Sequence, residues 1–437
     1  MPDILVLGAT GFTGRLVTRY LASHPARSSF TFAIAARSKS KLDELKRNLQ
    51  LDDAIRVLQV DVTQPTQVED AVKSARVVIN TVGPFWKWGD PVVRACALNG
   101  RHYVDLTGET HWIRKMIWKY DYVATKNNAI IIPCCGFDSV PADLLALLAN
   151  NVLKDTVGPQ AELGRSLTVY KMKGGLSGGT FSTIMTITEI PPDEIRRSME
   201  DYSLAPGIRG APTPGPKLFH RVPLTSPRRY AMPWFMSGPN RAVVQRTWSL
   251  YALAAQAGNA QDDAARRVYG PRFTYEEGFQ PGGGISRFLP VLLMSVVYYL
   301  SLAALFFLPP ARWLVKHLAP ASGEGPSEEV MKNGWFEATN YTASAPRAGE
   351  PEVHVKTVMR GSGDPGYELT SVMIVESALA ILLDKASLPA LANQGGILTP
   401  ASALGEVLVR RLEATGRIQI ESTVVRPGDT EESRKAR

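Results

Sequence analysis

The chain has 437 residues, of which 45% are hydrophobic and 21% are charged, so it can bury the cores of two domains and general disorder is excluded. Its formal net charge is +8, but the basic residues are spread through proline-rich sequence without a nucleic-acid-binding motif, which argues against nucleic acid as a partner. The three cysteines cannot form a disulfide framework, and no cysteine–histidine spacing indicates a metal site.

The first predicted elements are a buried strand over Ile4–Leu7 and a helix that starts near Gly11, joined by a Gly-x-x-Gly-x-x-Gly turn. We expect Gly8 to permit the tight turn, Gly11 to let a pyrophosphate approach the backbone, and Gly14 to let helix and strand pack closely. This strand–turn–helix context predicts a dinucleotide site. Its expected residues are Gly8, Thr10, Gly11, Phe12, Thr13 and Gly14. The alternative is a glycine turn that serves packing alone. Because the strand begins almost at once, we expect no cleaved signal peptide.

The second predicted strand, Thr31–Ala36, ends at Arg37 and Ser38, where NAD-preferring sites usually carry an acid that contacts the ribose hydroxyls. A guanidinium suits a 2′-phosphate in charge and in bidentate geometry, and Lys39 and Lys41 add positive charge nearby. These residues predict that NADP(H) is preferred over NAD(H). The alternative for Arg37 is a solvated surface charge.

Two more strands are predicted over Ile55–Val60 and Val77–Val82. Ligands of open parallel sheets lie outside the carboxyl ends of the strands. We therefore expect Asp61–Val62 to flank the adenine and Gly83–Pro84 to border the nicotinamide ribose. Asp61 suits a cap for the following helix equally well.

Helix and strand patterns alternate as far as Leu153, with another interior strand over Ala129–Cys135. This alternation predicts an α/β fold, a Rossmann-type doubly wound parallel sheet. After Tyr170 the pattern changes to a glycine-rich loop and a helix expected from Thr180, so a second, α+β domain is expected from about residue 155. From Ala205 to Pro239 prolines and glycines recur without apolar periodicity, which predicts a long loop or partly disordered insertion.

Late in the chain, Glu368–Leu383 reads as a long helix. Thr399 is placed to cap a helix whose first residue is Pro400, and the amphipathic helix is expected to continue over Ala401–Leu412. The polar, charged tail from Pro427 is expected to be mobile.

Six segments of the sequence, taken together, resemble those of a known enzyme family. They are Gly8–Gly14; Asn80–Phe85 with Gly89, Val92, Val93 and Cys96; Tyr103–Glu109; Gly136–Pro141 with Asp143; Gly178–Thr180; and Gly395–Ala401. In these segments the chain resembles the saccharopine dehydrogenase-like oxidoreductases, including the trans-acting enoyl reductase branch. The resemblance covers nearly the whole chain. It implies an N-terminal Rossmann domain for a nicotinamide dinucleotide, a central α+β domain and a C-terminal segment that returns to the first domain, but neither saccharopine as substrate nor any particular catalytic residue.

The expected domains follow from the pattern and the resemblance. Residues 1–154 form the NAD(P)-binding domain, and residues 155–364 form a substrate or dimerisation domain with a basic, proline-rich insertion at 205–245. Residues 365–425 form C-terminal helices that pack back on the first domain, and residues 426–437 form the tail.

No acidic residue lies between Tyr202 and Gln261. Seven basic residues fall there: Arg209, Lys217, Arg221, Arg228, Arg229, Arg241 and Arg246. A segment with charge of one sign is expected to seek anions, and each basic residue near an anionic membrane contributes about 1 kcal/mol. An ordinary solvated loop is the alternative.

The run Phe288–Leu308 carries no charge and exceeds the roughly 20 residues that cross a bilayer core. Arg287 precedes it, and Pro309–Pro310 and Trp313 follow it, as interfacial anchors would. We expect monotopic insertion into a membrane or lipid-droplet surface, since a single span would separate parts of one Rossmann fold. Burial between domains or subunits and a true span are the alternatives. The resemblance supports the membrane, because related proteins are found on lipid droplets and other membranes.

Six polar residues at or just after predicted strand ends are candidates for an acid or base near the nicotinamide. They are Tyr103, Asp105, Glu109, His111, Asp138 and Ser139. Asp105 and Glu109 also fit capping and turn roles, and His111 also fits simple packing beside Trp112. No catalytic residue is assigned.

The expected function is NADP(H)-dependent hydride transfer to or from a hydrophobic, lipid-like enoyl or carbonyl substrate, in a pocket between domains and without a metal. The expected location is the cytosolic face of a lipid droplet or the endoplasmic reticulum, with a homodimer as a candidate assembly. One alternative is reduction of an imine that joins two amino acids, which requires cationic side chains in the cleft. The other is a non-catalytic NADPH-binding scaffold on a lipid surface.

Overall fold

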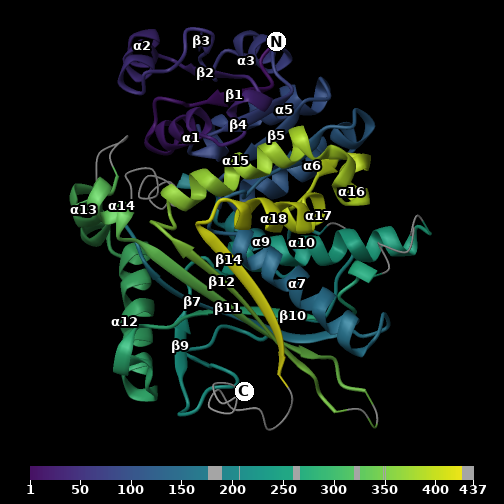
Figure 1. Ribbon diagram of the computed structural model, residues 1–437. Helices are drawn as coiled ribbons and strands as arrows, with labels where there is room; N and C mark the ends of the chain where they lie inside the picture. The colour runs from purple at the N-terminus through teal and green to yellow at the C-terminus, as the bar shows by residue number, and fades with distance from the viewer. Residues whose placement is uncertain are drawn as a thin grey trace.

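The computed structural model describes residues 1–175, 189–205, 207–258, 266–318, 325–347, 349 and 351–425. Two seven-stranded sheets organise the molecule, one in the N-terminal part and one in the central part (Figure 1). The helix expected from Thr180 lies outside the described residues, as does the segment Gly178–Thr180.

The first sheet is parallel in every pairing and has the strand order β13-β6-β5-β4-β1-β2-β3. Its strands are β1 Ile4–Leu7, β2 Phe32–Ala36, β3 Arg56–Gln59, β4 Val77–Asn80, β5 His102–Asp105, β6 Ile130–Ile132 and β13 Gly396–Ile397. The helices between these strands are α1 Phe12–Ala22, α2 Lys39–Asn48, α3 Pro65–Lys73, α4 Phe85–Trp88, α5 Asp90–Leu98 and α6 Thr110–Lys126. This is the predicted doubly wound Rossmann sheet.

Burial on both faces explains why these strands read as continuous apolar runs. Every residue of β1, β2 and β4 is buried. Successive side chains of β1 point to opposite faces, so Ile4 and Val6 join one hydrophobic cluster while Leu5 and Leu7 join another. Helices therefore cover both faces of the sheet.

The second sheet is mixed, with the order β14-β12-β11-β7-β10-β9-β8. Its strands are β7 Leu163–Lys173, β8 His220–Arg221, β9 Tyr230–Pro233, β10 Thr274–Phe279, β11 Trp335–Ser344, β12 His354–Ser362 and β14 Ile418–Val425. Only β7 and β10 pair in parallel. Two long helices pack against this sheet, α7 Val140–Val157 and α10 Ser237–Gln256.

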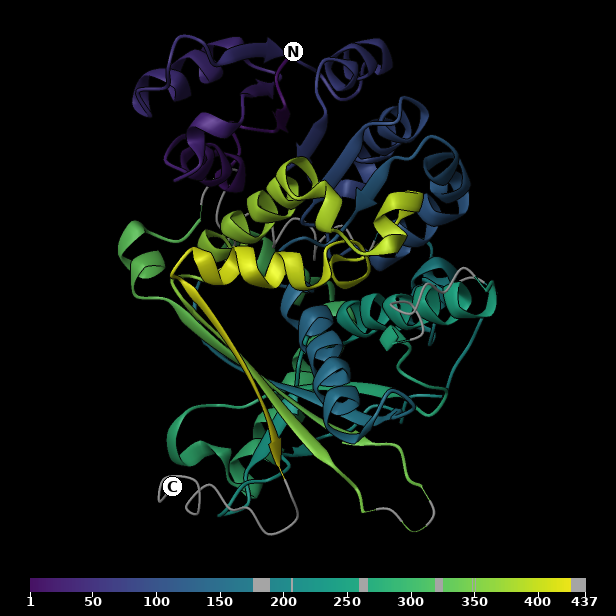
Figure 2. The ribbon, with the colours of Figure 1, turned by 45° about the vertical axis from the view of Figure 1, so that its right-hand side comes forward.

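The C-terminal segment returns to the first domain, as expected. Its helices are α15 Glu368–Leu383, α16 Ala390–Gln394, α17 Pro400–Ala403 and α18 Gly405–Ala414, and the two longest lie between the two sheets (Figure 2). Helix α15 has the predicted bounds and packs against α1. Its buried Glu376 accepts hydrogen bonds from Tyr20 at 2.7 Å and from Arg411 at 2.8 Å, and lies 2.9 Å from the His24 ring nitrogen. The Thr399 cap with Pro400 at the first helical position is also confirmed.

Three expectations are wrong in detail. The helix over Ala401–Leu412 is broken at Leu404, because Gly405 has a φ of +50°. Residues 418–425 are strand β14, which pairs with β12 in the second sheet and does not pack as helix on the first domain. The loop expected from Ala205 to Pro239 contains strands β8 and β9, because β9 pairs with β10 and β8 pairs with β9, which satisfies backbone groups of both strands.

The basic segment is only partly available to anions. Lys217 is paired with Glu276, and Arg241 with Asp201. Arg246 is buried and donates to the carbonyl oxygens of Ile397 and Leu204 at 2.9 and 2.7 Å. These three cations bind residues of the same chain and so stabilise the fold instead of binding external anions.

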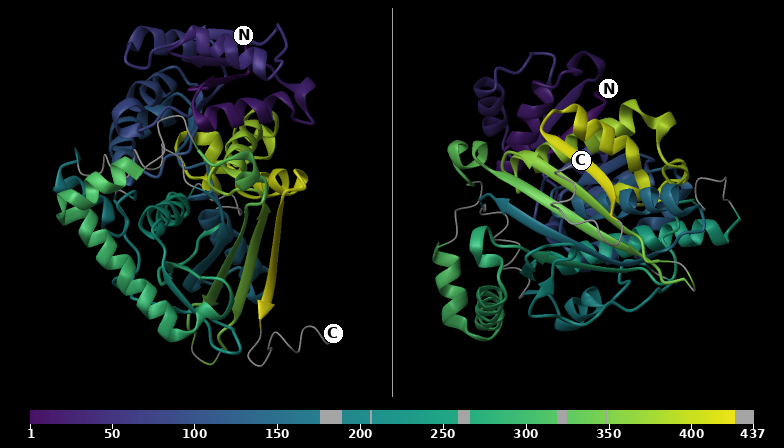
Figure 3. Two further views of the ribbon diagram at one scale, coloured as in Figure 1. Left: turned by 90° about the vertical axis from the view of Figure 1, so that its left-hand side faces the viewer. Right: turned by 60° about the horizontal axis from the view of Figure 1, so that its bottom comes forward.

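The apolar run forms helix α12, Phe288–Phe307, followed by α13, Pro309–Leu318, and α14, Glu328–Lys332. Helix α12 lies on the outside of the molecule beside β9, away from the N-terminal sheet (Figures 1 and 3). Within the described residues it is the one helix long and apolar enough to cross a membrane. Only Val291 and Ser295 are buried along its length among the side chains that the structure describes.

Candidate active site

The glycine turn between β1 and α1 has the geometry that its spacing predicts. Gly8 has a φ of +83°, which favours glycine, and a Cβ there would lie 2.7 Å from the Thr81 hydroxyl oxygen. A Cβ on Gly14 would lie 2.1 Å from the Gly8 carbonyl oxygen, so Gly14 permits the close packing of α1 on β1. Both glycines are therefore required by the backbone itself.

Gly11 is less crowded than Gly8 and Gly14, the other two glycines of the turn. A Cβ there would meet one described atom within 4 Å, the Gly8 carbonyl oxygen at 3.2 Å. Gly11 is also the N-cap of α1, and no described side chain caps this helix end. The N–H groups of the first turn are thus available to an anion.

The other predicted residues of the turn lie around this helix end. Thr10 and Thr13 are partly exposed, and the Thr10 carbonyl oxygen accepts a hydrogen bond from Arg15 at 3.3 Å. The Phe12 ring packs edge-on against Tyr367, with ring centroids 5.3 Å apart. Phe12 thereby connects the turn to the residues that precede α15.

Arg37 and Asp61 come together at the carboxyl ends of β2 and β3. They line one cavity of about 500 Å³ together with Gln59, Gln64 and Gln67. Arg37 is exposed, and Ser38 caps α2 by accepting a hydrogen bond from the Lys41 N–H. Hydrogen bonds from the Thr63 backbone and side chain lower the pKa of Asp61, and Arg37 contributes further.

The structure shows whether Asp61 caps the next helix and whether Val62 lines the cavity. Asp61 forms a turn with Thr63, and the N-cap of α3 is Gln64 instead of Asp61. Val62 is buried in the apolar core, so its side chain is not directed into the cavity. Gly83 and Pro84 follow β4, and Pro84 is the N-cap of α4.

Three of the six candidate acids and bases have structural roles. Tyr103 donates to Asp105, which also accepts from the N–H groups of Thr107 and Cys134. Glu109 accepts from the N–H groups of Phe85 and Trp86 at 2.9 and 2.7 Å and so holds the start of α4. Burial raises the pKa of Asp105 to about 7 and also raises the pKa of Glu109.

The other three candidates lie in different surroundings. Burial lowers the pKa of His111 to about 4, so its ring is neutral at pH 7, and its Nε2 has no hydrogen-bond partner among the described residues. Ser139 donates to Asn240 at 3.1 Å. Asp138 is half-buried, and its carboxyl makes no hydrogen bond or ion pair with any residue that the structure describes.

The sequence did not indicate one buried cluster next to Asp138. Glu277 accepts hydrogen bonds from Tyr170 at 3.0 Å, from Tyr275 at 2.8 Å and from Asn240 at 3.0 Å. These residues come from β7, β10 and α10, and Tyr170 and Asn240 are 107 and 37 residues from Glu277 along the chain, so no local pattern reveals that they meet. The local signal is a pair of adjacent acids, Glu276 and Glu277, within one strand.

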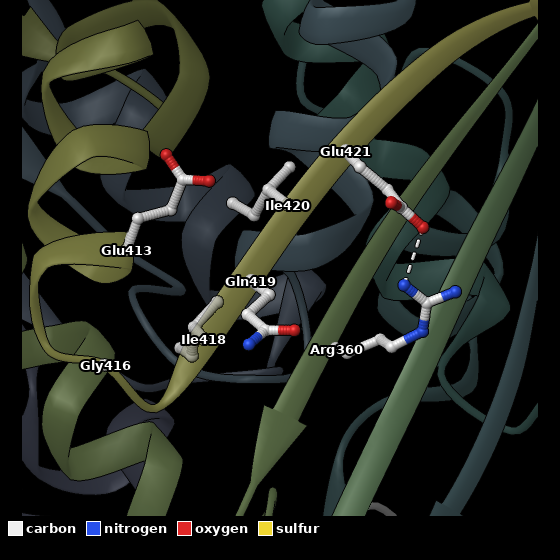
Figure 4. Close-up of a pocket in the computed structure, with 7 residues that line it drawn as sticks. All are labelled: Arg360, Glu413, Gly416, Ile418, Gln419, Ile420 and Glu421. Carbon is white, nitrogen blue, oxygen red and sulfur yellow. Dashed lines mark hydrogen bonds and ion pairs between the residues drawn. The ribbon is translucent and has the colours of Figure 1, made fainter.

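A second, smaller cavity of about 270 Å³ lies on the β14 side of the central sheet (Figure 4). Arg360 of β12 and Glu421 of β14 point toward each other across it and form an ion pair at 2.6 Å. None of the predicted cofactor residues lines this cavity.

Comparison with known proteins is consistent with the geometry of the first domain. The family model described as the saccharopine dehydrogenase NADP binding domain matches residues 4–132. A relative from Mycobacterium tuberculosis is 32% identical over 433 residues, which are 95% of this chain and 96% of the relative. A protein named trans-acting enoyl reductase from Mycobacterium bovis is 30% identical over 428 residues, with the same coverage of both chains.

Solved structures support the fold. Saccharopine dehydrogenase (L-Glu forming) from Saccharomyces cerevisiae aligns with 98% of this chain and 100% of its own, with a TM-score of 0.54 and 13% identity. Full-length relatives at this level of identity, together with the glycine turn and the Arg37 cavity, place the chain among the saccharopine dehydrogenase-like oxidoreductases of the trans-acting enoyl reductase kind, with NADP(H) as the cofactor.

Proposed function

We propose that this oxidoreductase transfers a hydride between NADP(H) and a hydrophobic, lipid-like enoyl or carbonyl substrate at the cytosolic surface of a membrane or lipid droplet. The observation that carries the proposal is α12, an exposed apolar helix in a chain whose N-terminal domain binds NADP(H). Reduced cofactor supplies the hydride when it is bound. The protein binds and orients both molecules and excludes water from the reacting carbon.

The residues of the first domain fit this cofactor along the sheet edge. Arg37, beside β2 and β3, would hold the 2′-phosphate, and the open backbone at Gly11 with the free N-terminus of α1 would hold the pyrophosphate. The next strand in the sheet order is β4, so Gly83 would border the nicotinamide ribose. The substrate would then lie beyond β4, at the ends of β5 and β6.

The surroundings of that position favour an apolar substrate. A Cβ on Gly108, after β5, would lie 2.9 Å from the Met236 methyl group. Trp234 stacks on Tyr170 with ring centroids 5.2 Å apart, and Tyr170 contacts Phe137. These contacts are apolar and aromatic, whereas an amino-acid imine would require cationic groups for its carboxylates. The relatives named enoyl reductase favour an enoyl substrate.

A turnover assay separates the three functions. Purified protein is expected to oxidise NADPH when trans-2-decenoyl-coenzyme A is added, and to show no turnover with lysine and 2-oxoglutarate. The loss of absorbance at 340 nm would measure both reactions. Turnover with the amino-acid pair alone would identify an imine reductase. Tight NADPH binding without turnover of either would identify a scaffold.

The exposed face of α12 is the basis of the membrane proposal. Leu293, Val297 and Leu300 lie on one face of the helix and are 59%, 62% and 65% exposed. Large apolar side chains that are exposed side by side on a helix mark an interaction site. The helix is thus not buried between the two domains of its own chain.

The topology favours insertion into one leaflet over a complete crossing. Strand β7 precedes α12 in the sequence and β11 follows it, yet the two strands are hydrogen-bonded neighbours. The same holds in the first sheet for β6 and β13. A single crossing at α12 would place paired strands on opposite sides of the membrane, which the sheets do not permit.

Exposed arginines belong to the segments that meet the first turn of α12. Phe288 contacts the rings of Phe219 and Tyr230, which belong to the β8–β9 region, at centroid distances of 5.0 and 5.4 Å. Arg221 and Arg228 of the same region and Arg287 before the helix are exposed. Their positive charge favours anionic headgroups next to the apolar face.

Replacing Leu293, Val297 and Leu300 by serine is expected to weaken binding to vesicles of phosphatidylcholine and phosphatidylserine by at least about tenfold. Full burial of one such side chain contributes about 1.5–3 kcal/mol, and about 1.4 kcal/mol corresponds to a tenfold change in affinity. Flotation through a sucrose gradient would measure the bound fraction. The matched control replaces Trp118 and Tyr122, which are 67% and 77% exposed on α6, by serine and should leave binding unchanged. Equal flotation of all three proteins would contradict the membrane proposal. A wild-type dimer that the triple variant converts to monomer would assign α12 to a subunit interface.

A further inference from the structure

We infer that Asp138 is the catalytic acid and base of this oxidoreductase, which gives a proton to the substrate during reduction and takes one during oxidation. The inference rests on the proposed function, because it requires a substrate whose double bond accepts a hydride at one atom and a proton at the next. It goes beyond that function by assigning the proton to one carboxyl group.

The position of Asp138 along the sheet edge is the first argument. In the strand order, the Arg37 cavity lies at β2 and β3, the glycine turn at β1 and Gly83 at β4. A dinucleotide that follows this edge from its 2′-phosphate brings its nicotinamide end toward β5 and β6. Asp138 lies in the loop between β6 and α7, which is the place that the reacting atoms would occupy.

The neighbours of Asp138 place its carboxyl near the loop that follows β5. A Cβ built on Gly108, which follows β5, would lie 3.9 Å from Asp138 Oδ2. The same point is 2.9 Å from the methyl group of Met236, which precedes α10 of the second domain. The carboxyl therefore lies where the two domains meet, beside an apolar side chain.

The free carboxyl of Asp138 is the second argument. Asp105 and Glu109 accept hydrogen bonds from neighbouring N–H groups, and Asp143 accepts from the Thr247 hydroxyl and the Ala401 N–H. Asp138 has no such partner among the residues that the structure describes. A half-buried carboxyl that makes no internal hydrogen bond is available to a ligand, and ionisable groups in such surroundings are concentrated at functional sites.

The charge of Asp138 raises the pKa of three titratable groups, namely Cys134 on its own loop, Tyr170 on β7 and Glu277 on β10. Burial raises the pKa of Asp138 to about 6. Burial also raises the pKa of Glu277 to about 8, an effect that hydrogen bonds from its three partner residues oppose and Asp138 increases. Both shifts keep the carboxyl pair from ionising fully together, so Asp138 can hold a proton near neutral pH.

The proton step balances for an enoyl thioester. The hydride forms a bond to Cβ, and the electron pair of the carbon–carbon double bond moves to Cα. The Asp138 carboxyl gives its proton to Cα, becomes a carboxylate, and regains a proton from water. The substrate is reduced by two electrons and NADPH is oxidised to NADP⁺. In the opposite direction the Asp138 carboxylate removes the proton from Cα.

Asp138→Asn is the variant that tests this role. We expect NADPH binding to change less than about twofold, while kcat with trans-2-decenoyl-coenzyme A falls by about 10²–10⁴-fold. An acid must be protonated to act, so wild-type kcat/KM should decrease as pH rises through about 6, and the variant should lack that decrease. The control is Asp143→Asn, which alters a bonded carboxyl in the same segment and should keep the pH dependence. Unchanged turnover in Asp138→Asn would overturn the assignment.

Stability provides a readout that does not depend on turnover. A carboxyl with a raised pKa in the folded state binds its proton more tightly there than in the unfolded chain, so the folded state loses stability as pH rises from about 4 to about 6. The unfolding midpoint is measured for wild type and for Asp138→Asn at each pH. The difference, wild type minus variant, should therefore decrease from about pH 4 to about pH 6 and stay constant above that. A flat difference would overturn the inference whether or not turnover is found. Absence of enoyl turnover in wild type, with the expected stability difference present, would instead contradict the proposed substrate.

Discussion

Alanine at Gly14 is expected to destabilise the protein by about 3 kcal/mol or more and to abolish measurable NADPH binding. The added Cβ would lie 2.1 Å from the Gly8 carbonyl oxygen and 2.8 Å from its carbonyl carbon, and both atoms belong to the backbone of the turn. Neither can move without displacing α1 from β1, whose residues are fully buried. Urea unfolding would measure the stability, and the change in NADPH fluorescence on titration would measure binding.

Two other glycines make this test specific. Gly238, in the first turn of α10, has no described atom within 4 Å of an added Cβ, so Gly238→Ala should leave stability unchanged or raise it slightly. At Gly11 the nearest atom would be 3.2 Å away, so Gly11→Ala should fold and still weaken NADPH binding. If Gly14→Ala unfolded at the same urea concentration as Gly238→Ala, the turn would not require the close packing of helix on strand.

The parts of the fold that the sequence predicted are those determined by local geometry. Strand β1 and helix α15 have the predicted bounds, because a continuous apolar run or a long uninterrupted helical pattern needs no distant partner to be recognised. The glycine turn belongs to the same class, since its spacing places Gly8 and Gly14 in contact. Thr399 and Pro400 likewise mark a helix start by local rules alone.

Long-range pairing explains what the sequence could not predict. Strands β8 and β9 lie in a segment without apolar periodicity. Strand β9 forms because β10 supplies hydrogen-bond partners from a distant part of the chain, and β8 pairs in turn with β9. The same limit applies within the site. Asp105, Asp138 and Asp143 look alike in the sequence, and only the folded chain shows that two of them are bonded while Asp138 is not.

Arg37→Asp is expected to weaken NADPH binding by about 10–150-fold, because hydrogen bonds to a charged group contribute about 1.5–3 kcal/mol each. NADH binding should change by less than about threefold, since NADH has no 2′-phosphate for the guanidinium to contact. Arg37 lines the cavity at the ends of β2 and β3 together with Asp61, whose carboxylate repels anions. The positive charge of Arg37 offsets that repulsion. Fluorescence titration with each coenzyme would give both dissociation constants.

The Arg56→Asp variant provides the charge-matched control, because Arg56 is exposed at the opposite end of β3 from the cavity residue Gln59. Arg56→Asp makes the same change in net charge. A loss of NADPH affinity that both variants show therefore reflects the electrostatic field of the whole domain and not a contact with the phosphate. The specific part of the effect should also shrink as salt is added, because an exposed guanidinium is screened over roughly 10 Å at 0.1 M ionic strength. Equal loss of NADPH and NADH affinity in Arg37→Asp would mean that this arginine supports the adenosine site as a whole, and the preference for the phosphorylated cofactor would then have to come from Lys39 or Lys41 on α2.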